Sequence, residues 1–267
     1  MSATPPSEDE LSRATARLRE AGIENPAREA RLISEIDGGA GFADLIDRRA
    51  GGVPYAHLTG SVGFYSIELI CDDRALIPRA DSETVVDIAL SRMPEGIKLK
   101  VADLGTGSGC LLLAILNERP DAVGVGVEAS PAAASLAREN ALRTGLSARA
   151  EIAETDWASW PDWPRMDLIV SNPPYIPTLD IEALQPEVRD HDPHTALDGG
   201  ADGLNAYRSL IPRAGDKLKA GAWLIFEIGH DQAADVSALL AGAGFTEIET
   251  TQDLGGCDRV VSARWPG

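Results

Sequence analysis

Residues 99–109 read LKVADLGTGSG, and this stretch decides the fold. The apolar run at 99–104 is typical of a buried strand, and it leads into a glycine-rich turn that opens an apolar helix. Gly105, Gly107 and Gly109 have no Cβ atom, so backbone amides of the turn can approach a ligand closely. A turn of this kind is equally typical of an ordinary tight connection, so its meaning depends on the rest of the chain.

The chain around this turn alternates between strand and helix patterns. Further strands are predicted at 122–128, 148–153, 166–171, 221–229, 245–250 and 259–264. Helices are predicted at 110–118, 130–145 and 231–241, and the second of them begins with Ser130 as N-cap and Pro131 in the first turn. The alternation predicts a doubly wound, seven-stranded parallel sheet, Rossmann-like, with ligands bound at the carboxyl ends of the strands.

Helical patterns precede this α/β region. Helices are predicted at 8–21, with Ser7 as cap, at 26–36, stopping at Gly38-Gly39, and at 42–49. Residues 63–77 have the features of a β-hairpin with a turn at Asp72-Asp73, and a helix is predicted at 82–92. We therefore expect a small helical domain at 1–60, a hairpin connector at 61–80 and an α/β domain at 81–267.

Composition and charge argue against several classes of protein. Of the 267 residues, 24 are Lys or Arg and 42 are Asp or Glu, and a net charge of −18 repels phosphate backbones. The three cysteines form no CxxC pair, which argues against a disulfide scaffold or a zinc site. The stretch RDHDPH at 189–194 is like a metal site, but it lacks further His or Cys ligands, and we expect no metal. An acidic N-terminus and the lack of an apolar run of about 20 residues predict a cytoplasmic protein without a membrane segment.

Acidic residues at strand ends indicate which cofactor the turn serves. A dinucleotide fingerprint needs Gly or Ala at position 110, where this chain has Cys110. A GxGxG turn preceded by Asp103 better suits S-adenosylmethionine (SAM), whose amino group the carboxylate can meet. Glu128 ends the next strand and can accept both hydroxyls of a ribose. Asp156 and Trp157 follow the third strand, where an adenine could stack or hydrogen-bond.

The sharpest signal is SNPPY at 171–175, directly after a predicted strand. Pro173 and Pro174 fix the backbone and remove two N–H donors, which makes a rigid loop. The Asn172 side-chain oxygen and the Pro173 carbonyl can accept both N–H bonds of a carboxamide, so that the nitrogen lone pair faces an incoming methyl group. The Tyr175 ring could pack on the substrate or near a sulfonium. Because an amide nitrogen is a poor nucleophile, positioning and hydrogen bonds are what such a site supplies.

Together these motifs resemble the HemK/PrmC family of N5-glutamine methyltransferases. The resemblance runs along almost the whole chain, in family order. It is carried by ENPAREARLI (24–33), RRAGGVPYAHLTGSVGFYSIEL (48–69), LIPRADSETVVDIAL (76–90), DLGTGSG (103–109), SNPPYIP (171–177), ALDGGADGLNAYR (196–208), FEIGHDQ (226–232) and DRVV (258–261). Departures are Ala80 where the family has proline, Glu128 where it has aspartate, and HLTG at 57–60.

The resemblance implies a substrate and a role for each matching residue. The substrate would be the glutamine of the Gly-Gly-Gln motif in class 1 peptide chain release factors. The SAM pocket would be lined by the turn residues Gly105, Thr106, Gly107, Ser108 and Gly109. SAM itself would be held by Asp103, Glu128, Asp156, Trp157 and Asn172. Asn172, Pro173 and Tyr175 would be catalytic, and these three with Pro174 and Arg79 would hold the acceptor glutamine.

Other functions remain open at this point. The nearest is the same reaction on a ribosomal-protein glutamine, with the N-terminal helices choosing the substrate. Adenine-N6 methylation of DNA also uses an NPPY-type loop, but it needs a basic groove that this acidic chain does not predict. A regulator that binds SAM without turnover would leave the NPPY loop idle. We expect a monomer that contacts a protein substrate and not nucleic acid.

Overall fold

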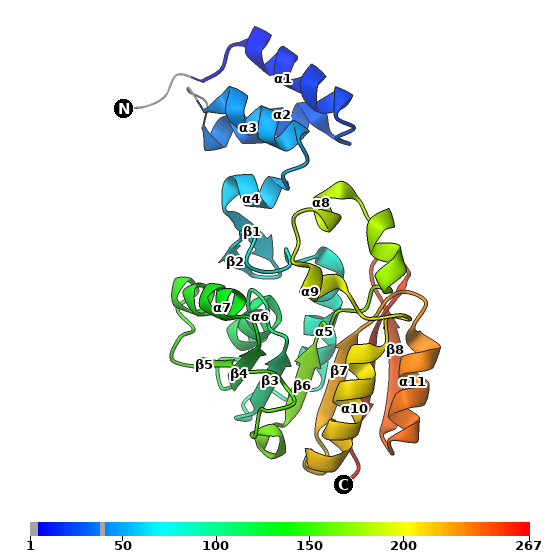
Figure 1. The fold of residues 1–267 in the computed structure, drawn as a ribbon. Coiled ribbons are helices and arrows are strands. Elements are labelled where there is room, and N and C mark those ends of the chain that lie inside the picture. The colour runs from blue at the N-terminus through cyan, green and yellow to red at the C-terminus, as the bar shows by residue number, and fades with distance from the viewer. Residues whose placement is uncertain (1–4, 38–40) are drawn as a thin grey trace.

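A computed structural model describes residues 5–37 and 41–267, and a group of helices forms its N-terminal end (Figure 1). Helices α1 (Glu8–Glu20), α2 (Pro26–Ile36) and α3 (Phe42–Ala50) pack on one another through Leu18, Ile33 and Ile46. The predicted cap of α1 is confirmed, since Ser7 Oγ accepts a hydrogen bond from Glu10 N at 3.3 Å. The predicted stop at Gly38-Gly39 lies outside the described residues.

A short helix and a hairpin connect these helices to the sheet (Figure 1). Helix α4 (Tyr55–Thr59) leads into β1 (Ser61–Phe64) and β2 (Ile67–Ile70), which pair antiparallel. The predicted hairpin is present, but its strands reverse at Tyr65 and Ser66, and the turn at Asp72-Asp73 follows the second strand instead of joining the two. Phe64 and Leu69, on either side of this reversal, are both buried in the core. Asp72 is instead bound to Arg74, which it holds through backbone and guanidinium.

Within the two described ranges the main sheet has seven strands, in the order β5-β4-β3-β6-β7-β9-β8. The strands are β3 (Lys100–Leu104), β4 (Val123–Glu128), β5 (Ala150–Glu154), β6 (Leu168–Ser171), β7 (Trp223–Glu227), β8 (Thr246–Gln252) and β9 (Asp258–Arg264). Strands β3 to β7 are parallel, as predicted. Strand β9 departs from that pattern and pairs antiparallel with β7, because a hairpin joins it to β8.

Helices cover both faces of this sheet, which makes it doubly wound. Helices α5 (Glu83–Ser91) and α6 (Cys110–Glu118) bury one face, while α10 (Asn205–Lys217) and α11 (Ala233–Gly242) bury the other. Side chains of β7 alternate between the two cores, with Ile225 on the first face and Leu224 and Phe226 on the second. Helix α7 (Pro131–Arg143) packs against β2, β4 and β5.

Several elements were not predicted from the sequence. They are α4, α10, the short helices α8 (Pro186–Arg189) and α9 (His194–Leu197), and the 3-10 turns η1 (Ala80–Ser82), η2 (Trp163–Arg165) and η3 (Thr178–Ala183). Pro212 inside α10 hides its helical pattern. In the described ranges, no helix has the length and apolar character needed to cross a membrane.

Candidate active site

A cavity of about 410 Å³ lies at the carboxyl ends of β3, β4 and β6. Most residues predicted to bind a cofactor or an acceptor meet in its wall, although they come from five separate segments. Its lining includes Asp103, Gly105, Thr106, Gly107, Ser108, Glu128, Asp156, Trp157, Asn172, Pro174 and Arg79. The glycine turn and the NPPY loop therefore share one cavity, which is the arrangement that a transfer between two bound molecules requires.

The glycine turn is tied to the neighbouring strand through its backbone. The amides of Gly105 and Thr106 donate to the carbonyl of Val127 at 2.8 and 3.1 Å. Gly105 and Gly107 have φ values of +73° and +56°, a region that side chains with a Cβ atom rarely adopt. These backbone bonds and φ values fix the shape of the turn beside the cavity.

Asp103 presents a buried carboxylate oxygen to this cavity. Its Oδ2 accepts a hydrogen bond from Thr106 Oγ1 at 2.6 Å, whereas its Oδ1 is buried with no partner in the described part of the chain. Burial raises the pKa of Asp103 to about 7, and the Thr106 hydroxyl opposes that rise. An unpaired acceptor of this kind fits a cationic group, which would restore the ionised form. The ammonium and sulfonium of SAM meet that requirement.

Glu128 is oriented for a pair of hydroxyls. Its Oε2 accepts from Gly107 N at 2.9 Å and its Oε1 from Ser130 N at 2.8 Å. An ionised carboxylate has about four acceptor sites, so each oxygen keeps one for a further donor. The two backbone bonds fix the plane of the carboxylate, and the remaining sites suit the adjacent hydroxyls of a ribose.

Asp156 and Trp157 close the cavity beyond β5. The Asp156 carboxylate accepts from Ala158 N and Ser159 N at 2.7 and 2.9 Å, and hydrogen bonds from Ser159 hold its pKa below the ordinary value. This turn places the Trp157 ring beside Gly105, where an added Cβ would lie 3.5 Å from the ring. An aromatic wall next to the glycine turn offers a surface on which a flat base can stack.

The NPPY loop presents different side chains to the cavity and to the core. Asn172 Nδ2 donates to Ser82 Oγ at 3.3 Å, which leaves the Asn172 Oδ1 acceptor available. Pro174 lines the cavity, whereas Pro173 is buried beneath it. The Tyr175 hydroxyl donates to Glu227 Oε1 at 3.2 Å, and its ring packs against the core. Neither Pro173 nor Tyr175 is among the residues that line the cavity.

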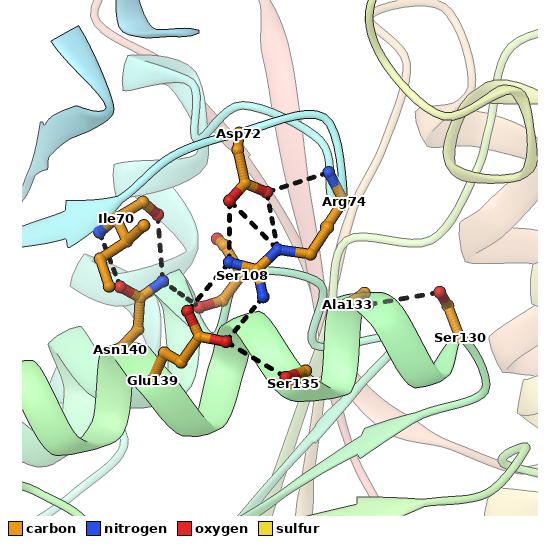
Figure 2. Close-up of polar contacts among 9 residues, drawn as sticks. All are labelled: Ile70, Asp72, Arg74, Ser108, Ser130, Ala133, Ser135, Glu139 and Asn140. Carbon is orange, nitrogen blue, oxygen red and sulfur yellow. Dashed lines mark hydrogen bonds and ion pairs between the residues drawn. The ribbon is translucent and has the colours of Figure 1, made fainter.

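The connector forms a wall of the cavity that the sequence reasoning missed, except for Arg79. Residues 74–79 all line it, and Figure 2 shows how this segment is attached to α7. The Arg74 guanidinium binds Asp72 at 2.8 Å and Glu139 at 2.7 Å. The Asn140 side chain accepts from Ile70 N at 2.7 Å and donates to Ser108 O at 2.9 Å, so it joins connector and glycine turn. Asn140, a polar residue in an alanine-rich helix, is a sequence signal that could have indicated this attachment, and the structure shows it fully buried.

The segment after the NPPY loop returns to the connector and to the N-terminal helices. Arg79 binds the buried Asp192 at 2.6 Å, so one acidic residue of RDHDPH pairs with a cation of the cavity wall. Arg49, itself buried, binds Glu29 of α2 at 2.6 Å and Glu187 of α8 at 2.7 Å. In the described ranges no three His, Cys, Asp or Glu side chains gather as metal ligands do.

Comparison with known proteins decides the family. The release factor glutamine methyltransferase of Caulobacter vibrioides is 44% identical to this chain over 264 residues, which cover 92% of this chain and 91% of that protein. The chain belongs to the release factor glutamine methyltransferases. The Rhodospirillum rubrum protein of the same name is 42% identical and covers 95% of this chain and 83% of its own length. The family resemblance predicted from the motifs is therefore confirmed.

Broader similarities agree with this membership of the release factor glutamine methyltransferases. Residues 80–185 match the family model described as methyltransferase small domain. The solved hMettl16 catalytic domain superposes with a TM-score of 0.57 at 17% identity, covering 84% of this chain and 82% of that one. The S-adenosylmethionine-dependent methyltransferase SibL gives a TM-score of 0.51 at 17% identity, covering 94% and 77%. At such identities these two structures establish the fold alone, and they confirm the predicted α/β class.

Proposed function

We propose that this enzyme transfers a methyl group from SAM to the side-chain amide nitrogen of the glutamine in the Gly-Gly-Gln motif of class 1 release factors. The observation that carries the proposal is the shared cavity, which has Asp103 and Glu128 on one side and Asn172 with its free Oδ1 on the other. Family membership supports the same reaction. We further propose that the protein acts as a cytoplasmic monomer that contacts protein and not nucleic acid, in keeping with its net charge of −18.

The cofactor would be held by residues of the glycine turn and of the strand ends. Asp103 Oδ1 faces the ammonium, Glu128 accepts from the ribose hydroxyls, and the Trp157 ring lies against the adenine. The backbone of residues 105–108 surrounds the remainder, whereas Gly109, predicted to do the same, does not line the cavity. Asp156 fixes the loop that carries Trp157. When bound, SAM supplies an electrophilic methyl group on a sulfonium.

The NPPY loop would hold the acceptor. Asn172 Oδ1 accepts one N–H bond of the glutamine amide, and the other goes to the Pro173 carbonyl, which lies between the lining residues Asn172 and Pro174 although Pro173 itself is buried. Pro174 packs beside the amide, and Arg79 belongs to the same cavity wall. A new N–C bond forms as the C–S bond breaks, positive charge grows on the amide nitrogen, and one N–H proton leaves to water. Hydrogen bonds from N–H to fixed acceptors strengthen as that charge grows, so the site stabilises the transition state more than the bound substrate. Tyr175 lies outside the cavity wall and holds the loop in place through the hydrogen bond from its hydroxyl to Glu227.

The test is methyl transfer from labelled SAM to a purified release factor. We expect labelling of the intact factor and none when the glutamine of its Gly-Gly-Gln motif is replaced. Asn172→Ala should lower turnover by at least about 100-fold, as loss of a transition-state acceptor does. Asn117→Ala, which removes an exposed asparagine far from the cavity, is the matched control and should leave turnover unchanged. Equal labelling of both factors would refute the assigned acceptor, and labelling of ribosomal protein or DNA instead would favour the other substrates.

A further inference from the structure

We propose that Ser82 and Glu227 are positioning residues that together fix which way the Asn172 side-chain amide faces. The inference rests on the proposed function, in which Asn172 must offer its oxygen and not its NH2 group to the acceptor. An asparagine amide that turns over would present two N–H donors to the two N–H donors of a glutamine amide, and the acceptor would be repelled. The orientation of this one amide therefore decides whether the site can hold its substrate.

Ser82 determines that orientation through its hydroxyl. It is 3% exposed, ends the turn η1 ahead of α5, and its Oγ accepts from Asn172 Nδ2 at 3.3 Å. A serine hydroxyl has one proton to donate and can also accept. If that proton pointed to Asn172, the asparagine would turn its oxygen toward Ser82 and its NH2 group into the cavity. The observed orientation therefore needs another acceptor for the Ser82 proton.

Glu227 is that acceptor. It ends β7, is 2% exposed, and its Oε1 already accepts from the Tyr175 hydroxyl at 3.2 Å. Its Oε2 is buried and has no hydrogen-bond partner in the described part of the chain. The Ser82 hydroxyl lies close enough to this carboxyl to lower its pKa, and in the proposed arrangement its hydrogen points to the unpartnered Oε2. An ionised carboxylate can only accept, so it forces the donor direction from Asn172 through Ser82 to Glu227.

The charges around Glu227 make this arrangement sensitive to pH. Burial raises the pKa of Glu227 to about 7, whereas the hydroxyls and Arg259 oppose that rise and Asp81 adds to it. The groups that face it from the neighbouring elements are Ser82 and Asp81 of η1, Tyr175 of the NPPY loop, Cys110 of α6, Tyr207 of α10 and Arg259 of β9. A protonated Glu227 can donate to Ser82 and release the Ser82 proton toward Asn172. Turnover should accordingly fall as the pH drops below about 7.

The first arm of the test measures turnover on the release factor. Ser82→Ala should lower kcat/KM for the factor by about 3- to 10-fold, the weight of one hydrogen bond, while Kd for SAM stays within twofold. Ser82→Thr keeps the hydroxyl and should recover turnover to within about twofold. With SAM saturating, which keeps Asp103 ionised, Glu227→Gln should flatten the pH profile between pH 6 and 8. Ser91→Ala, an exposed serine at the other end of α5, is the matched control.

The second arm needs no substrate and follows the Asn172 side-chain NH2 signals by nitrogen-15 NMR, assigned by their loss in Asn172→Ala. In the wild type these signals should shift with pH through about 7, and in Glu227→Gln they should not. The absence of any shift in the wild type would overturn the inference, as would a Ser82→Ala enzyme equal to wild type beside an inactive Asn172→Ala. A shift without methylation of the release factor would support the inference on orientation and refute the proposed acceptor. The wild-type titration remains decisive even if Ser82→Ala fails to fold.

Discussion

Replacement of Asp103 by asparagine should make the free protein more stable and bind SAM less well. In the ligand-free fold, burial raises the pKa of Asp103 from the ordinary 3.8 to about 7. Between those values the folded state holds a proton that the unfolded chain has lost, so the destabilisation is absent below pH 3.8 and complete above pH 7. A shift of about three pKa units means that the buried Asp103 carboxylate lowers the free energy of unfolding by about 4 kcal/mol at pH 8. The same relation gives a loss of about 2 kcal/mol at pH 5.

Asparagine has nearly the same shape and keeps an oxygen for Thr106. It removes the charge and places an NH2 group where the unpaired Oδ1 lies. Denaturant unfolding at pH 8 should therefore show Asp103→Asn to be more stable by up to about 4 kcal/mol, with roughly half that gain at pH 5. SAM affinity, measured by calorimetry, should fall by about 10- to 100-fold, since a charged hydrogen bond contributes about 1.5–3 kcal/mol.

The matched control for this prediction is Asp121→Asn, an exposed aspartate in the turn before β4, which should change neither quantity. Stability of Asp103→Asn equal to or below that of the wild type at pH 8 would refute the reasoning. A gain that grows toward low pH would refute it as well, because the sign of the linkage would then be reversed.

Three further outcomes follow from contacts in the structure. Arg49→Met should lower the free energy of unfolding by about 3 kcal/mol, because it leaves Glu29 and Glu187 without their buried partner, and denaturant unfolding will measure this. Asn140→Leu should lower the free energy of unfolding by about 2–3 kcal/mol in the same experiment, because two backbone carbonyls and one backbone amide lose their hydrogen-bond partner. A variant more stable than the wild type would contradict these hydrogen bonds. Glu128→Gln should weaken SAM binding by about 10-fold in calorimetry, whereas the exposed Glu151→Gln on β5 should not, and equal affinities would exclude the ribose contact.

The sheet could be predicted because its strands carry their own signal. Apolar runs such as 99–104 are buried on both faces, so no partner information is needed to recognise them. The direction of β9 could not be predicted, since a strand of this composition pairs equally well either way and the short hairpin to β8 decides. Helix α10 was missed because Pro212 interrupts its pattern, although tertiary packing of Tyr207 and Leu210 holds it helical.

The candidate site was predictable where a motif supplies its own backbone geometry. The glycine turn and the NPPY loop have shapes fixed by residue type, and both line the cavity. The connector could not be predicted in the same way, because Arg74 binds Glu139 and Ile70 binds Asn140, and both partners lie far along the chain. The same holds for Tyr175, whose hydroxyl direction is set by Glu227 and not by any neighbour in sequence.

One wall of the cavity is built from the very segment that joins the N-terminal helices to the sheet. Residues 74–79 line the cavity, and α7 holds the connector through Glu139, which binds Arg74, and Asn140, which binds Ile70. A chimera that borrows another protein's helices must therefore be spliced upstream of the hairpin. Gly60, which has a φ of +68° where α4 ends, is a natural junction for such a graft. Splicing at residue 80 instead would replace the cavity wall formed by residues 74–79 with that of another protein. Cofactor affinity would then change together with substrate choice.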